Sequence, residues 1–145
     1  MKKIVLLLAI LLLVGCSHKT FYLSDKYYHN GDYISVTSND IKSLDNESYV
    51  LYIYNNYCNL PIHCENIFKD VMDKYKIDFL SMPFAEFKKT SFHNKVKYAP
   101  SIIIIKNNDI IAYLYANSDK DYDKYQNTEE FEKWLKEYIY LEKNN

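Results

Sequence analysis

The sequence predicts an α/β domain in which helices cover both faces of a mixed β-sheet. Three observations support this prediction. Residues 49–54 are aromatic or β-branched without polar alternation, which is typical of a strand buried on both faces. The segment that follows repeats apolar side chains at helical spacing. Residues 101–105 and 110–115 are apolar runs separated by a short polar turn, as in a hairpin.

In chain order, residues 33–36 are predicted to form the first short strand. Residues 38–46 are predicted to form a polar connection with one apolar pair at helical spacing. The strand at residues 49–54 comes next. Pro61 suits the first position of the helix after it, because proline lacks the N–H that this position leaves unpaired. The apolar side chains on one face of this helix are Cys64, Ile67, Phe68, Val71, Met72 and Tyr75.

The second half of the domain begins with a strand at residues 77–82, which we expect to end at Pro83. A longer loop leads to the hairpin of residues 101–105 and 110–115. The turn at residues 106–109 reads Lys-Asn-Asn-Asp, and asparagine tolerates the left-handed conformation that tight hairpins need. The hairpin therefore adds antiparallel strands to a parallel βαβ unit.

A closing helix ends the domain, with Asn127 or Thr128 as its cap. Glu130 is spaced for a capping box with Asn127. The apolar residues on one face are Phe131, Trp134, Leu135 and Tyr138. Residues 33–145 contain no internal repeat and are expected to form one domain.

The amino terminus resembles that of a bacterial lipoprotein. Residues 1–15 combine two lysines with an apolar run that is too short for a membrane span, which needs roughly twenty residues. The run ends in Leu-Val-Gly-Cys, similar to a lipobox, so Cys16 is expected to carry a lipid that anchors the chain at the extracytoplasmic face of the cell membrane. The alternative is an ordinary cysteine after a secretory signal. Residues 16–32 lack periodicity and are interpreted as the lipidated residue and a tether.

The charge pattern excludes one class of partner. The net charge is −1 and every basic side chain is lysine, without the basic patch that nucleic-acid binding needs. The 16 tyrosines reflect either an AT-rich genome or a tyrosine-rich face for a partner, because tyrosine combines a large ring with a polar tip.

Over residues 33–140 the chain resembles the thioredoxin-like superfamily. Tyr57-Cys58 follows a buried strand, where thioredoxins have tryptophan before the first active-site cysteine, and the helix pattern then matches without a gap. Pro100 stands where the family has a cis-proline. The chain departs from the family in its motif, which reads Cys58-Asn59-Leu60-Pro61 with proline at the second cysteine position. The family's buried acid and strand lysine fall at Tyr52 and Ser81.

The resemblance implies that Cys58 is a nucleophile at the amino end of the helix, where the helix dipole favours the thiolate. Cys64 is the candidate resolving residue. If residues 58–64 were all helical, the two backbones would lie about 9 Å apart, beyond the roughly 7 Å limit of a disulfide. A bridge therefore needs residues 59–60 in a loop. A redox pair, a lone reactive Cys58 and an absence of thiol chemistry all remain open.

Substrate binding is assigned by the same resemblance to Tyr57, Ala99 and Pro100. A cis Pro100 would expose the backbone of Ala99 beside Cys58, where an extended substrate could pair with it as a short strand.

Three functions follow from these expectations. The first is a membrane-tethered thiol–disulfide oxidoreductase that acts on thiols or disulfides of exported proteins. The second is a non-enzymatic accessory lipoprotein of an export or bacteriocin system. The third is copper handling by the cysteines with His63 or His93. This function is disfavoured because the neighbouring residues His63 and Cys64 point to different helix faces. We therefore expect no bound metal or other cofactor.

Overall fold

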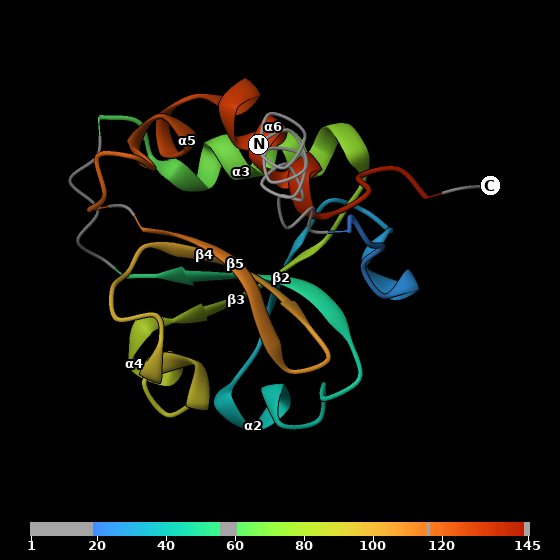
Figure 1. Ribbon diagram of the computed structural model, residues 1–145, viewed down its shortest axis with the longest axis vertical. Helices are drawn as coiled ribbons and strands as arrows, with labels where there is room; N and C mark the ends of the chain where they lie inside the picture. Colours follow the sequence, from blue (N-terminus) through green and yellow to red (C-terminus); the bar gives the residue numbers. More distant parts are fainter. Residues whose placement is uncertain (1–18, 56–60, 116, 144–145) are drawn as a thin grey trace, which may run out of the picture.

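In the computed structural model, which describes residues 19–55, 61–115 and 117–143, five strands form one mixed sheet in the order β1-β3-β2-β4-β5 (Figure 1). Strand β3 pairs in parallel with both β1 and β2, whereas β4 pairs antiparallel with β2 and β5. The strands are β1 Tyr33–Ser35, β2 Ser48–Tyr54, β3 Phe79–Pro83, β4 Ser101–Lys106 and β5 Asp109–Tyr115. The predicted βαβ unit and hairpin are therefore confirmed.

Helices cover both faces of this sheet, as the sequence predicts. Figure 1 shows α3, α5 and α6 on one face, with α2 and α4 on the other. The helices are α2 Ser38–Ile41, α3 Cys64–Tyr75, α4 Phe84–Phe87, α5 Tyr122–Gln126 and α6 Thr128–Tyr138, with 3-10 turns η1 Asp25–Tyr27 and η2 Ser91–Asn94. Within the described ranges, no helix is long and apolar enough to cross a membrane.

The core lies between the sheet and the layer of α3 and α6. Val50, Leu51 and Ile53 of β2 are completely buried, because this strand has a neighbour on each side and helices above and below. The rings of Phe68 in α3 and Phe131 in α6 pack with centroids 4.5 Å apart. Burial of these apolar side chains from water is the main stabilising contribution of the fold.

The predicted hairpin turn between β4 and β5 and the predicted Asn127 cap of α6 are both present. Asn107 and Asn108 have φ of 50° and 65°, the left-handed conformation predicted for the hairpin turn. Asn127 caps α6 by accepting hydrogen bonds from the N–H groups of Glu129 and Glu130. The N–H of Asn127 donates to the carbonyl of Asp123, so the cap and the preceding short helix α5 share this residue.

The start of α3 corrects a sequence prediction. The helix begins at Cys64 and not at Pro61, with His63 in extended conformation as its cap residue. The backbone of Ile62 is held by the amide of Gln126, which accepts from its N–H at 3.1 Å and donates to its carbonyl at 3.0 Å. This distant side chain binds the carbonyl that a helix starting at Pro61 would have paired within itself, and it also satisfies the N–H of Ile62, which such a helix would leave unpaired.

The interpretation of residues 16–32 as a tether is wrong for the part that the structure describes. Phe21, Leu23 and Tyr27 are buried in the core. Phe21 pairs with Ile139 as a parallel bridge, and the N–H of Ser24 donates to the carbonyl of Ser48 at 2.8 Å. These contacts are made by isolated bridges and a single turn, so they leave no periodic pattern in the sequence. The expected signal peptide and Cys16 lie outside the described residues.

Candidate active site at the carboxyl end of β2

The candidate site lies where β2 ends beside the start of β4. Ile53 is paired with Ser101 across these antiparallel strands. Just beyond β2, the side-chain amide of Asn55 donates a hydrogen bond to the carbonyl of Ala99 at 3.0 Å. The chain therefore enters the segment that carries Tyr57 and Cys58 from a point tied to Ala99. Both of those predicted site residues lie outside the described residues.

The peptide bond between Ala99 and Pro100 is cis, as the resemblance implied for this position. Pro100 is buried, and its carbonyl lies 3.3 Å from the hydroxyl of Tyr125, which also donates to the carbonyl of Leu114 at 2.7 Å. The hydroxyl of Ser101 donates to the carbonyl of Tyr98 at 2.7 Å. Side chains from α5 and β4 thus fix the backbone on both sides of the proline.

Cys64 is the first residue of α3 and is only 2% exposed. Its sulfur lies 3.7 Å from the hydroxyl of Tyr52, a residue of β2. Burial raises the pKa of Tyr52 far above its ordinary value, and the neighbouring Cys64 raises it further, so this phenol stays neutral. Attack by Cys64 on another sulfur therefore requires that Tyr52 or the start of the helix move.

A second tyrosine, which belongs to β1, packs beside Tyr52 near the start of α3. The ring of Tyr33 packs 5.5 Å from that of Tyr52, and its hydroxyl donates to the carbonyl of Glu65 at 3.0 Å. Burial, followed by the nearby Cys64, also raises the pKa of Tyr33. Tyr52 pairs in register with Ser81, so neutral side chains occupy the two positions at which the resemblance implied an acid and a lysine.

Two exposed apolar side chains are close in sequence to the predicted site residues. Ile62, four residues after Cys58, is 45% exposed, and Tyr98, which precedes Ala99, is 56% exposed. The contact of Ile62 with Gln126 connects the first of these residues to the end of α5, one residue after Tyr125. Asn55, Tyr125 and Gln126 were missed by sequence analysis, because their importance comes from partners that are 44, 25 and 64 residues away.

The histidines considered for copper lie in different parts of the fold. His63 is exposed before α3. His93 belongs to η2, where its ring contacts Phe84 and Phe87 and its Nδ1 lies 3.1 Å from the carbonyl of Val96. In the ranges that the structure covers, no three histidine, cysteine or acidic residues are grouped as metal ligands.

Comparison with solved structures finds thioredoxins. A thioredoxin from Nicotiana alata superposes with a TM-score of 0.54 at 17% identity, covering 73% of this chain and 91% of that protein. A thioredoxin from Schistosoma mansoni superposes with a TM-score of 0.51 at 20% identity, covering 75% of this chain and 97% of that protein. No protein-family model and no curated protein sequence matches the chain. The strand order, the helices on both faces and these likenesses show that the chain has the thioredoxin fold.

Proposed function

We propose that this protein is a membrane-anchored, extracytoplasmic thiol–disulfide oxidoreductase-like protein that acts on exported proteins. The observation that carries the proposal is the hydrogen bond between Asn55 and Ala99. It ties the chain just before Cys58 to the segment with which an extended substrate would pair. A nucleophilic sulfur and a backbone that receives the substrate are the two parts that disulfide exchange requires.

In the proposed reaction, the thiolate of Cys58 attacks one sulfur of a substrate disulfide. A mixed disulfide forms, and the other substrate sulfur leaves as a thiolate that takes up a proton. The thiolate of Cys64 then attacks the sulfur of Cys58, which releases the second substrate thiol and leaves a bridge between the two cysteines. The substrate gains two electrons, which an external dithiol must return to the protein, and the reverse sequence oxidises a substrate dithiol.

The position of Cys64 supports its role as the resolving residue. Because α3 begins at Cys64, residues 61–63 are not helical, and the separation of about 9 Å expected for a continuous helix does not apply. The loop that a bridge requires is therefore allowed by the start of α3. The burial of Cys64 behind Tyr52 makes this second step slower than the first.

The substrate would pair with the backbone of Ala99 beside Pro100, with Tyr57 on the other side of the nucleophile. Exposed Ile62 and Tyr98 would provide apolar contacts to its side chains. The anchor in this proposal is a lipid on Cys16, supported by the signal-like segment of residues 1–15.

The test is reduction of a disulfide-containing model protein by the lipidated full-length chain in detergent, with dithiothreitol as electron donor. We expect Cys58→Ser to abolish the catalysed rate. When dithiothreitol is omitted, Cys64→Ser should accumulate a mixed disulfide on Cys58, visible as an added mass that reductant removes. The enzyme proposal is wrong if the unaltered chain neither accelerates the reduction nor forms an adduct on Cys58.

A non-enzymatic accessory lipoprotein is the second candidate. It is favoured by the neutral pair of Tyr52 and Ser81, because an efficient thioredoxin uses charged groups there to move protons. Under this alternative the same assay would give no catalysis, and Cys58 would react with iodoacetamide only as fast as an unactivated thiol.

A further inference from the structure

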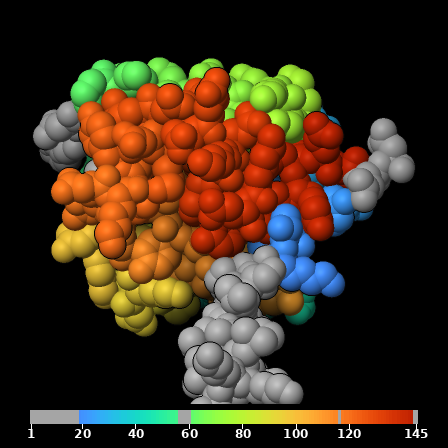
Figure 2. Space-filling view, turned by 45° about the horizontal axis from the view of Figure 1, so that its top comes forward, coloured from blue at the N-terminus to red at the C-terminus, as the bar shows by residue number. Residues whose placement is uncertain are grey.

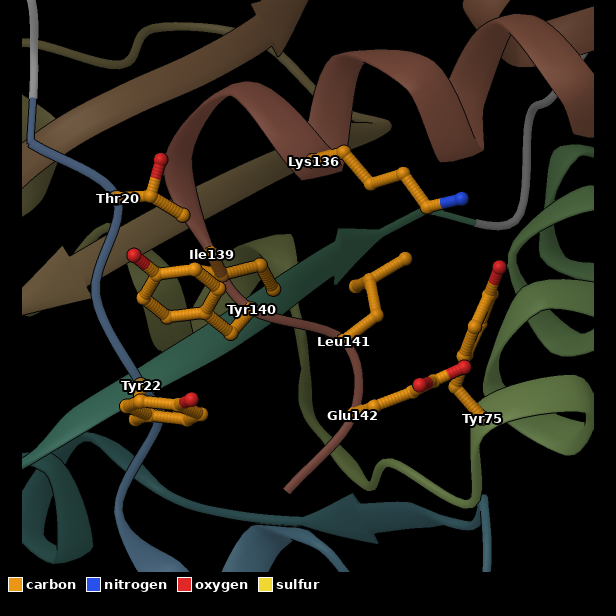
Figure 3. A pocket seen from close by; sticks show the side chains of 8 residues that line it. All are labelled: Thr20, Tyr22, Tyr75, Lys136, Ile139, Tyr140, Leu141 and Glu142. Carbon is orange, nitrogen blue, oxygen red and sulfur yellow. The ribbon is translucent and has the colours of Figure 1, made fainter. Parts of the chain in front are cut away.

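An open pocket lies where the first described residues meet the end of the chain. It has a volume of about 660 Å³ and is lined by residues 20 and 22, by α3 and α6, and by residues 139–142. Figure 3 shows Tyr22 and Thr20 on one side, Tyr140 and Leu141 of the carboxyl-terminal segment beside them, and Lys136 and Tyr75 across the opening.

The amino-terminal segment is clamped at this place from Phe21 onward. The N–H of Phe21 donates to the carbonyl of Tyr138 at 3.0 Å, and the N–H of Tyr140 donates to the carbonyl of Phe21 at 2.9 Å. Five residue steps separate Phe21 from Cys16, so even a fully extended chain would place the two no more than about 18 Å apart. A lipid on Cys16 therefore cannot be far from this pocket.

The candidate active site lies at the opposite end of the sheet. Ser24 is hydrogen-bonded to Ser48 at the start of β2, whereas Asn55 follows the end of the same strand. Six steps along β2 at the usual strand rise span about 20 Å. Figure 1 agrees, because the blue amino-terminal segment lies at one end of the sheet and the arrowhead of β2 points to the other.

The surface around the pocket has the side chains that suit a lipid interface. Tyr22 and Tyr140 are 37% and 45% exposed, and their ring centroids lie 4.5 Å apart. The hydroxyl of Tyr28 donates to the carbonyl of Tyr140 at 2.6 Å. Lys136 and Lys143 are also exposed and have long apolar stems. Tyrosine rings lie at the headgroup level of membranes, and lysine stems extend from there to water.

The charges of this surface are nearly balanced. Lys143 forms an ion pair with Asp25 at 3.2 Å, Lys136 forms one with Glu132 at 2.6 Å, and Glu142 also lines the pocket. Attraction to anionic lipids therefore contributes little, and contact depends on the rings and on the tether. Figure 2 shows the blue residues of the amino-terminal segment directly beside the red carboxyl-terminal residues, so that the two form one continuous surface.

We propose that this amino-terminal aromatic face, defined by Tyr22, Tyr28, Tyr140, Lys136 and Lys143, rests on the lipid bilayer that holds Cys16. The occupant of the face is the bilayer surface, brought there by the short connection to the lipid. The end of the sheet with Ala99 and Pro100 then faces away from the membrane, toward exported proteins. The inference rests on the proposed lipid anchor, and it adds an orientation that the anchor alone does not specify.

The test is lysine footprinting of the full-length lipidated chain on phosphatidylcholine vesicles. A water-soluble acylating reagent labels lysines, and mass spectrometry compares each site with the unlipidated Cys16→Ser chain, expressed without residues 1–15, in solution. On the vesicle, the tyrosine rings of the face and the lipid exclude the reagent. We therefore expect labelling of Lys136 and Lys143 to fall about threefold or more relative to the chain in solution. Lys97 and Lys120 are exposed and lie close in sequence to Ser101 and Tyr115, which pair at the end of the sheet that carries the candidate site, so they should keep their solution rates.

Matched double variants of exposed tyrosines test whether Tyr22 and Tyr140 form the surface that contacts the bilayer. In the lipidated chain, Tyr22→Ser with Tyr140→Ser should return Lys136 and Lys143 toward their solution rates. The control is Tyr98→Ser with Tyr122→Ser, which removes two other exposed tyrosines and should leave the footprint unchanged. Circular dichroism verifies that both double variants are folded.

Equal labelling of all four lysines on vesicles and in solution, or protection of Lys97 and Lys120 instead, would overturn the orientation. The mass of Cys16 is measured in the same sample, so loss of the lipid would identify failure of the anchor and would remove the inference with it. Failure of the disulfide assay with an intact footprint would reject the enzyme proposal alone.

Discussion

The hydroxyl of Tyr52 lies 3.7 Å from the sulfur of Cys64, at the point where α3 meets the sheet. In this position Tyr52 fills the space that the resemblance implied for an acid and shields the second cysteine from water. In the proposed reaction the two cysteines would therefore have different tasks, because exchange would begin at Cys58 and would involve Cys64 only after movement.

We predict a large difference in the reactivity of Cys64 between folded and unfolded chains. In Cys58→Ser, iodoacetamide should modify Cys64 at least about 100-fold more slowly in buffer than in urea, because a buried thiol reacts only through local opening. The matched variant Cys64→Ser leaves Cys58 as the reporter and should be modified quickly in buffer. Mass spectrometry measures both rates, and rapid native labelling of Cys64 would contradict the burial.

Hydrophobic patterns predicted the elements of the fold because those patterns are local. The apolar strand at residues 49–54 and the turn at Asn107 and Asn108 each show their structure within a few residues. The start of α3 was mispredicted because Pro61 fits a helix start by itself, whereas Gln126 holds Ile62 from 64 residues away. No local pattern reports such a partner.

The site was predictable only in part for the same reason. The resemblance identified the position of Pro100, and the cis bond there is as implied. Asn55 looked like a polar residue that merely ends a strand, and its bond to Ala99 appears only when β2 and β4 are paired. Phe21 and Tyr27 were assigned to a tether because an isolated bridge and a single 3-10 turn have no period.

We predict that Asn55→Ala lowers the rate of disulfide reduction about tenfold, because Ala99 loses the bond that holds it beside the end of β2. The free energy of unfolding should fall by only about 1 kcal/mol, the usual contribution of one hydrogen bond. Asn117→Ala, at an exposed position after β5, is the control for both measurements. An unchanged rate would show that this bond has no part in catalysis.

Gly31 is predicted to tolerate no side chain. Its φ is +85°, and a Cβ would lie 2.6 Å from the carbonyl oxygen of Met72 at the end of α3. Gly31→Ala should therefore lower the free energy of unfolding by about 2–3 kcal/mol in urea titrations. Asn107→Gly, at another position with positive φ, should cost little because glycine accepts that conformation.

Asp78 is expected to stabilise the same loop through its charge. One carboxylate oxygen accepts hydrogen bonds from the N–H groups of Gly31 and Asp32 at 2.8 Å each, and from Asn30 at 3.2 Å. Asp78→Ala leaves these donors without their acceptor, so unfolding free energy should fall by about 2–3 kcal/mol. Asp78→Asn keeps one acceptor oxygen and should lose less. Equal loss in both variants would mean that the negative charge, which both variants remove, makes the whole contribution.

Glu132 joins α6 to α3 and gives the fold a dependence on acid. It accepts hydrogen bonds from Lys136 at 2.6 Å, Tyr75 at 2.7 Å and Lys74 at 2.8 Å. Desolvation acts to raise its pKa, but these donors, with Lys136 foremost, lower the pKa to about 2. A carboxyl whose pKa is lower in the folded chain stabilises it above the ordinary value of 4.5 and loses that contribution as the pH falls toward 2.

Glu132→Gln should therefore lower the free energy of unfolding by about 1–2 kcal/mol at neutral pH, since charge-assisted bonds between the helices are weakened. The difference from the unaltered chain should shrink steadily between about pH 4.5 and pH 2, as the carboxyl of the unaltered chain becomes protonated. Glu137→Gln, exposed on the same helix, should change stability little across this range. Urea titrations at several pH values measure the effect, and a difference that stays constant down to pH 2 would mean that the charge of Glu132 does not stabilise the contact of α3 with α6.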